Sequence, residues 1–96
     1  MQSKTQKFAN IFKALACETR LKIVVGLLNT KECNVNNMAV HLGIAQPNVS
    51  QHLAVLKNAG IIEGYRNGNQ ICYRVVDDMT EKIINNLNLS LQIAHN

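Results

Sequence analysis

The sequence contains no tryptophan and few other aromatic residues, which together make up only 4% of the chain. Proteins that bind single strands or RNA commonly stack the bases on aromatic side chains, so this scarcity disfavours those partners. No apolar run approaches the roughly 18 residues that a membrane-spanning helix needs. The chain also lacks a glycine-rich phosphate loop, a pair of cleft carboxylates and a nucleophile beside a base. We therefore expect neither a membrane protein nor an enzyme.

Cysteine is scarce as well, with only Cys17, Cys33 and Cys72 present. Three thiols cannot all pair within one chain, and none of them belongs to a C-x-x-C motif. This usage is typical of the reducing cytoplasm and not of a secreted domain held by disulfides. We predict a cytoplasmic protein in which Cys72 fills space under a β-strand and Cys33 is exposed in a polar loop.

The residues that are present suffice for one small basic domain. The chain has 96 residues, of which 47% are hydrophobic. A chain of this length buries only about 60 to 65% of its unfolded surface, too little for two cores. Ten Lys and Arg against six Asp and Glu give a formal net charge of +4, which favours an anionic partner. We predict a single domain over residues 1–96.

Apolar spacing predicts four helices in the first part of the chain. The first has an apolar stripe, because apolar residues recur at helical intervals at Phe8, Ile11, Phe12 and Leu15. The third is short and stops at Gly43, and the fourth follows after three residues, with Pro47 in its first turn. Two helices joined by so tight a turn form a helix-turn-helix. The four helices are expected at residues 1–15, 19–29, 36–42 and about 47–59.

The second part of the chain predicts a hairpin and a last helix. Residues 61–66 and 70–76 are rich in β-branched and aromatic side chains, and Asn67-Gly68 between them suits a tight turn. The acidic run that starts at Asp77 can cap the last helix, at residues 78–94. Its apolar stripe consists of Ile83, Ile84, Leu87, Leu91 and Ala94.

The order of these elements, α-α-α-α-β-β-α, predicts a mainly α fold with a small β-hairpin, which is a winged helix-turn-helix. The last helix carries no Lys or Arg after Lys82. A helix so poor in charge should be buried, and a second subunit is the obvious candidate for its partner.

The fourth helix has a face suited to reading bases. When Val49, Leu53 and Leu56 point inward, the opposite face is polar, nearly uncharged and small at Ala54, so the helix can approach DNA closely. Amides such as Gln51 can hydrogen-bond both edge atoms of adenine in the major groove. A polar outer face is also the ordinary state of a surface helix. From this helix alone, DNA readout and a plain solvated face both stay open.

The hairpin tip adds a cation and small polar groups, namely Arg66, Asn67, Gly68 and Asn69. Such a tip can enter a minor groove or lie along phosphates. For the asparagine and glycine of the turn, backbone angles alone are the better explanation, so Arg66 is the functional candidate. If DNA is the partner, Lys57 and Arg74 should also lie near the recognition face.

Several segments together resemble a known family. These are FKALA at 12–16, TRL at 19–21, VSQHLAVLK at 49–57, AGII at 59–62 and ICYR at 71–74. They are similar to the ArsR/SmtB family of bacterial winged-helix repressors, over about residues 8–77. The resemblance implies a homodimer held by its first and last helices. Such a dimer reads an inverted repeat and represses transcription until an effector loosens it.

The resemblance also implies roles for particular residues. One departure from the family is Ala45, where many relatives have a helix-capping Ser. The expected DNA-binding residues are Gln46, Asn48, Ser50, Gln51, His52, Lys57, Arg66, Asn67 and Asn69. The expected dimer-interface residues are Phe8, Ile11, Ile84, Leu87 and Leu91.

The metal sites common in the family are incomplete in this chain. One uses a Cys-x-Cys on the third helix, where the corresponding run is Asn34-Val35-Asn36, with Cys33 displaced just before it. Another uses Asp and His residues of the terminal helix, where His95 stands alone, and one His does not complete a tetrahedral site. We expect no bound metal and no cofactor.

Cys17 is the candidate thiol sensor. It stands just before the second helix, whose positive end, with Lys13 and Arg20 close in sequence, would favour a thiolate. The alternative is a small, inert, half-buried residue. Persulfide-sensing relatives link an early helix to the terminal one by a cysteine pair, and the terminal helix here has no cysteine.

The sequence thus predicts a dimeric, sequence-specific DNA-binding repressor that thiol modification or metal could release. Two alternatives stay open. One is a winged-helix module that binds a protein, and the other is a repressor without any small-molecule effector. Steep loss of affinity with salt would favour DNA as the partner, because binding displaces counterions.

Overall fold

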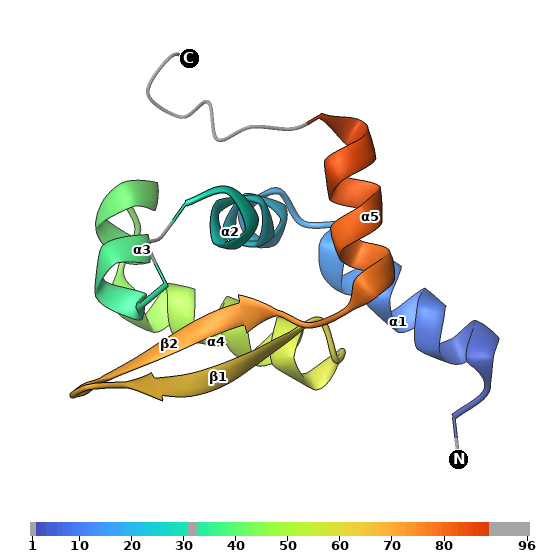
Figure 1. Cartoon of the computed structure of the whole chain (residues 1–96), viewed down its shortest axis with the longest axis horizontal. Helices are drawn as coiled ribbons and strands as arrows, with labels where there is room; N and C mark the ends of the chain where they lie inside the picture. Colours follow the sequence, from blue (N-terminus) through green and yellow to red (C-terminus); the bar gives the residue numbers. More distant parts are fainter. Residues whose placement is uncertain (1, 31–32, 89–96) are drawn as a thin grey trace.

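The computed structural model describes residues 2–30 and 33–88 of the chain. It is a mainly helical winged helix-turn-helix with one antiparallel hairpin, which confirms the predicted fold class (Figure 1). Within these residues, no helix has the length and apolar character that crossing a membrane requires. The elements are α1 (Lys4–Leu15), α2 (Glu18–Asn29), α3 (Val35–Leu42), α4 (Gln46–Asn58), β1 (Ile62–Asn67), β2 (Gln70–Val75) and α5 (Asp78–Leu87).

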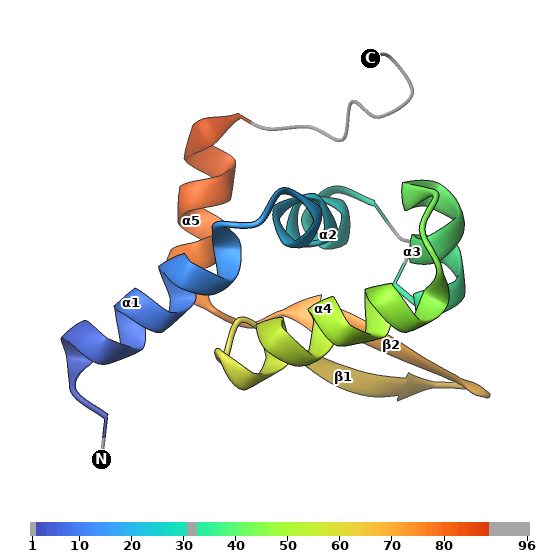
Figure 2. The same cartoon turned by 180° about the vertical axis from the view of Figure 1, so that it is seen from behind.

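Helix α2 lies at the centre of the fold. Figures 1 and 2 show α3 on one side of it, α1 and α5 on the other, and α4 with the hairpin along its remaining side. Its Ile23, Val24 and Val25 are buried, and they join apolar side chains from every other helix and from the hairpin in one core. Each such side chain stabilises the fold by about 1.5 to 3 kcal/mol when fully buried. This core fixes α3 and α4 relative to the hairpin.

The hairpin turn lies one residue later than the sequence predicted. The strands pair in antiparallel register up to Asn67 opposite Gln70, so the two-residue loop is Gly68-Asn69. Of these residues only Gly68 has a left-handed backbone, with φ +65°. A glycine at the first loop position is typical of a type II′ turn, whereas the expected Asn-Gly turn would need positive φ at both positions. Asn67 therefore belongs to β1.

Helix α5 begins with a side-chain cap, as predicted. The Asp77 carboxylate accepts the Thr80 N–H at 2.8 Å and the Thr80 hydroxyl at 2.6 Å. Since Thr80 is fully buried, this carboxylate satisfies a hydroxyl that water cannot reach. The described helix ends at Leu87, with Asn88 in the left-handed conformation. The predicted features that lie outside the described residues are the continuation of the helix to residue 94, Leu91, Ala94 and His95.

Candidate nucleic-acid interface

Helix α4 turns its predicted polar face to solvent. Its apolar residues Val49, Leu53 and Leu56 are buried, so the predicted division of the two faces is confirmed. No side chain caps the helix at Ala45, and Lys57 is exposed in the last turn. The polar face therefore offers amides on either side of a small residue, without charge. The exposed residues along it are Asn48, Ser50, Gln51, Ala54 and Asn58.

The turn between α3 and α4 is closed by backbone and side-chain hydrogen bonds. Gly43 ends α3 with φ +70°, and its N–H and that of Ile44 both donate to the Ala39 carbonyl oxygen. Across the turn, Gln46 Nε2 donates to Asn36 Oδ1 at 2.8 Å. Gln46, an expected DNA-binding residue, thus links the two helices at their exposed surface. These bonds set the angle at which α4 faces outward.

His52 is half-buried because Arg20 of α2 reaches it. Arg20 Nη1 lies 3.3 Å from His52 Nδ1, and Arg20 Nε donates to the Ala14 carbonyl oxygen at 2.7 Å. A guanidinium can only donate, so Nδ1 is the acceptor in this contact and Nε2 is the ring nitrogen that it leaves unused. Nothing in the sequence pattern connects these positions, which stand 32 residues apart.

The wing carries one free cation and one that is paired. Arg66 is exposed on β1, and within the described residues it forms no ion pair. Arg74 donates through Nε and Nη2 to Glu63 Oε1, at 3.0 and 2.7 Å, and its guanidinium lies 4.9 Å from the centre of the Tyr65 ring. Arg74 is thus on the wing but paired with Glu63 of the neighbouring strand, and its contact with DNA stays a prediction.

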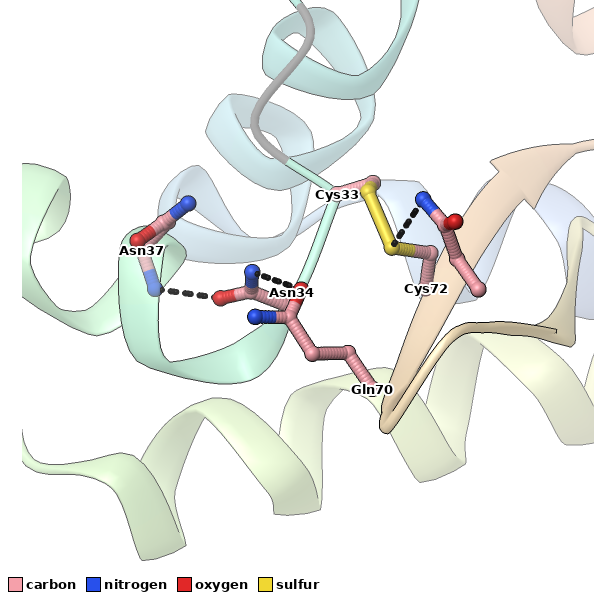
Figure 3. The surroundings of a disulfide bond; sticks show 6 residues. Cys33, Asn34, Asn37, Gln70 and Cys72 are labelled. Carbon is pink, nitrogen blue, oxygen red and sulfur yellow. Dashed lines mark hydrogen bonds between the residues drawn. A yellow bond between two sulfur atoms is a disulfide. The ribbon is translucent and has the colours of Figure 1, made fainter.

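Two of the cysteines come together. Cys33, in the segment before α3, forms a disulfide with Cys72 of β2, 39 residues further along (Figure 3). Cys72 is fully buried, as expected of a residue under the wing. Cys33 is half-buried rather than exposed. We had expected unpaired thiols, because no motif marks so distant a pair.

Cys17 stays a free cysteine and is half-buried at the N-cap of α2. Its side chain makes no capping hydrogen bond. Of the two cations close to Cys17 in sequence, Arg20 binds Ala14 and His52, and Lys13 is exposed near the end of α1. The role of Cys17 as a thiol sensor stays a prediction.

The expected dimer residues differ in what they can offer a partner. Ile11 and Ile84 are buried within the subunit, at 0% and 2% exposure, so little of either side chain is left for an interface. Helical spacing marks the buried face of a helix but does not separate core from interface. Phe8 is half-buried against the same core. Leu87 is 57% exposed, and Phe12, which was predicted on the apolar stripe of the first helix but not among the interface residues, is 52% exposed.

No metal centre is visible among residues 2–30 and 33–88. Within them, no three His, Cys, Asp or Glu side chains come close enough together to hold an ion. His95, the lone ligand candidate of the terminal segment, lies outside these residues.

A helix-turn-helix with an amide-bearing second helix and a cationic wing defines a winged helix-turn-helix DNA-binding protein. The family described as "Bacterial regulatory protein, arsR family" matches residues 17–64. The "Biofilm growth-associated repressor" of Xylella fastidiosa is 36% identical over 87 residues, which cover 91% of this chain and 75% of that protein. The chain belongs to the arsR family, and it is a DNA-binding transcriptional repressor, not an enzyme.

Solved structures agree with this assignment. HlyU from Vibrio cholerae N16961 is similar with a TM-score of 0.81 and 28% identity, over 92% of this chain and 95% of that one. Mb0332 from Mycobacterium bovis is described as a homodimeric winged helix-turn-helix DNA-binding domain. It is similar with a TM-score of 0.78 and 27% identity, over 91% of this chain and 84% of that one. The predicted resemblance to the ArsR/SmtB family is confirmed.

Proposed function

We propose that two copies of the chain form a two-fold symmetric repressor that reads an inverted repeat in duplex DNA. The observation that carries the proposal is the exposed α4 face, on which Asn48 and Gln51 precede the small Ala54. A two-fold dimer places its recognition helices about 34 Å apart, one turn of DNA. The description of Mb0332 as a homodimer supports the same arrangement for this chain.

We expect the residues of α4 to contact base edges and the residues of the wing, with Lys57, to contact phosphates. Gln51 can donate to and accept from one adenine, and His52 can donate through Nε2. Asn67 Nδ2 donates to the Cys72 sulfur at 4.0 Å, and Arg66, Asn67 and Asn69 are all exposed at or beside the turn. The proposed base-reading residues are Gln46, Asn48, Ser50, Gln51 and His52. The proposed backbone-binding residues are Lys57, Arg66, Asn67 and Asn69.

The proposed dimer is built on α1 and α5, within residues 1–15 and 78–94. Both views place these helices at the same end of the molecule, opposite the wing tip (Figures 1 and 2). The exposed apolar side chains there include Phe12 and Leu87, whose burial against a partner would favour association. A two-fold axis at this end keeps both wings free to reach DNA.

We infer that the protein is cytoplasmic, because its proposed DNA partner is there. We also infer that thiol chemistry controls its binding to DNA. The bonded pair Cys33 and Cys72 supports this form of control in the chain itself. HlyU of Vibrio cholerae, one of the similar structures, has also been solved in a form described as reduced. Cys17 is the second thiol that a modifying agent could reach.

The first test is a selection of tight-binding duplexes from a random library, followed by fluorescence anisotropy on the selected duplex and a scrambled one. We expect an inverted repeat and a steep loss of affinity with salt. Gln51→Ala should cost about 1 to 3 kcal/mol of discrimination at one position of each half-site. The scrambled duplex is the control, because its binding should change little in this variant. A protein that enriches no sequence would refute the proposal.

Arg66→Ala separates phosphate binding from base reading. It should weaken binding to selected and scrambled duplexes alike. Because each subunit loses one phosphate contact, the slope of log affinity against log salt should fall by about two. A selective loss on the selected duplex would instead place Arg66 on a base edge.

A further inference from the structure

The wing is attached to the start of α3 by more than the disulfide. The Tyr73 N–H donates to the Cys33 carbonyl oxygen at 3.0 Å, and Asn34 pairs with Cys72 as an isolated antiparallel bridge. Asn34 Nδ2 also donates to Gln70 Oε1 at 2.9 Å (Figure 3). The segment before α3 therefore lies against β2 as a short additional strand.

The same segment holds the first turn of α3. The Asn34 side chain accepts the Asn37 N–H at 2.8 Å and so forms the N-cap of the helix (Figure 3). Residue 34 thus belongs to α3 through its cap and to the wing through its bridge. The chain between the two cysteines contains α3, α4 and β1, which is most of the DNA-binding unit. A bond between Cys33 and Cys72 closes that unit into a ring.

We propose that Cys33 and Cys72 form a reversible dithiol–disulfide site that couples the redox state of the cell to the order of the wing, with the oxidised form binding the operator more tightly. The inference rests on the proposed function, because the readout is operator affinity. Disulfides in cytoplasmic proteins are usually transient and redox-sensing rather than structural. The site is distinct from Cys17 and joins the helix-turn-helix to the wing.

The placement of the two sulfurs suits a stepwise exchange. Their Cα atoms lie 4.7 Å apart, within the range of about 4.4 to 6.8 Å that a disulfide spans without backbone movement. Cys33 is half-buried, whereas Cys72 has no exposed surface. A small reagent in solution therefore meets Cys33 first, and Cys72 is the resolving thiol.

The oxidant that we propose is a low-molecular-weight disulfide of the glutathione type. The Cys33 thiolate attacks one of its sulfurs, forms a mixed disulfide and expels one small thiolate. The Cys72 thiolate then attacks the Cys33 sulfur, forms the protein disulfide and expels the second small thiolate. The two protons of the cysteine thiols go to the two leaving thiolates. The protein loses two electrons and the small disulfide gains them.

The consequence for DNA follows from the cost of ordering the wing. In the reduced protein the segment before α3 holds β2 through the hydrogen bonds of Asn34 and Cys33 without a covalent link, so the outer part of the wing is freer to fray. The disulfide removes that freedom before DNA arrives, so less ordering remains to be done on binding. Pre-organisation of this kind raises affinity without a new contact, here by about three- to tenfold.

The experiment equilibrates the full-length protein in buffers of varied reduced-to-oxidised glutathione ratio, quenches with an alkylating agent and maps the cysteines by peptide mass. We expect one transition, in which Cys33 and Cys72 lose the mass of two hydrogen atoms. Cys17→Ser should titrate identically. Cys33→Ala and Cys72→Ala should each abolish the transition. Because both variants are measured, misfolding of one of them cannot by itself account for the result. A bond that includes Cys17, or none at all, overturns the inference.

Hydrogen exchange and DNA binding then test the coupling. Amides of residues 66–72 should exchange more slowly in the oxidised protein, and the selected duplex should bind it about three- to tenfold more tightly. Cys33→Ala should bind like the reduced protein under both conditions. Equal or weaker binding by the oxidised form overturns the inference while leaving the proposed function intact. If neither form selects a duplex but the bond forms and protects the wing, the proposed function fails and the redox site stands.

Discussion

Arg20 and His52 join three helices at one point. The guanidinium of Arg20, in the first turn of α2, binds the last turn of α1 through the Ala14 carbonyl oxygen and the middle of α4 through His52 Nδ1. His52 is the one predicted base-reading residue that is half-buried rather than exposed. Its imidazole is therefore positioned from behind by a residue that does not itself lie on the α4 face.

Arg20→Ala should lower affinity for the selected duplex. The loss of one hydrogen bond to His52 costs about 1 kcal/mol, or roughly a fivefold loss of affinity, if a fixed imidazole is needed at the base edge. Lys22→Ala is the control. It removes a cation from the same helix, and this cation pairs with Glu18 at 3.1 Å and not with α4. Anisotropy on selected and scrambled duplexes measures both. If both variants lose the same affinity for the selected duplex, the effect of Arg20→Ala is explained by the loss of positive charge and not by the contact with His52.

Arg20→Lys refines the same test. Lysine keeps the charge but is a point donor and cannot reproduce the two-directional fork of the guanidinium. We expect it to behave like the alanine variant on the selected duplex and like the wild type on the scrambled one. A lysine variant with wild-type specificity would show that charge alone suffices at this position.

The order of elements was predictable because each has a local cause. Gly43 ends α3 in the left-handed conformation, Asp77 caps α5, and Val49 with its helical partners faces the core. The turn was placed one residue early because Asn67-Gly68 is the stronger local signal. Strand register, which makes Asn67 a partner of Gln70, is decided by pairing across the hairpin and not by the turn residues alone.

The exposed residues of α4 were predictable from the sequence, whereas the contacts between α4, the wing and the neighbouring helices were not. Exposure of Gln51 follows from helical periodicity within one element. The pairings of Arg20 with His52, Arg74 with Glu63, and Cys33 with Cys72 are tertiary contacts. Such contacts depend on how elements pack, and one sequence carries no spacing rule for them. Ile84 shows the same limit. An apolar stripe on a helix can face either the core of its own subunit or a second subunit, and the sequence does not distinguish the two.

Glu63→Gln should strengthen non-specific DNA binding. The Arg74–Glu63 pair is half-exposed, at 58% and 48% of the side chains, so its removal costs only about 0 to 1 kcal/mol of stability. The freed guanidinium of Arg74 can then contact phosphate, and the salt slope should rise by about two for a dimer.

Glu81→Gln is the matched control, because it removes the same charge from an exposed position outside the wing. A general gain in positive charge would raise affinity equally in both variants. Only a larger gain for Glu63→Gln, with a steeper salt dependence in anisotropy titrations, identifies Arg74 as a masked phosphate ligand.

Leu87→Glu should weaken the proposed dimer. Burial of a leucine side chain contributes about 1.5 to 3 kcal/mol, so the dissociation constant of the dimer should rise by at least about tenfold. Val40→Glu on α3 is the control, since Val40 is 76% exposed away from α1 and α5. Sedimentation equilibrium measures both. An unchanged dimer in Leu87→Glu would place the interface elsewhere.

Asp77→Ala should destabilise the fold far more than Asp78→Ala. The Asp77 carboxylate both caps α5 and accepts the hydroxyl of Thr80, which has no exposed surface. Loss of a cap costs about 1 kcal/mol, and a buried hydroxyl left without a partner costs about 1 to 3 kcal/mol more. Asp78 pairs only with Lys82, four residues on, between two largely exposed side chains. Its loss should cost about 0.5 kcal/mol or less.

Urea unfolding under reducing conditions measures both aspartate variants without a contribution from the Cys33–Cys72 bond. The double variant Asp77→Ala, Thr80→Val separates the two costs, because valine leaves no hydroxyl to satisfy. It should regain the part of the free energy of unfolding that the orphaned hydroxyl removes and keep the loss of the cap. If the double variant is no more stable than Asp77→Ala, the hydroxyl finds another partner and the carboxylate acts on α5 only as a cap.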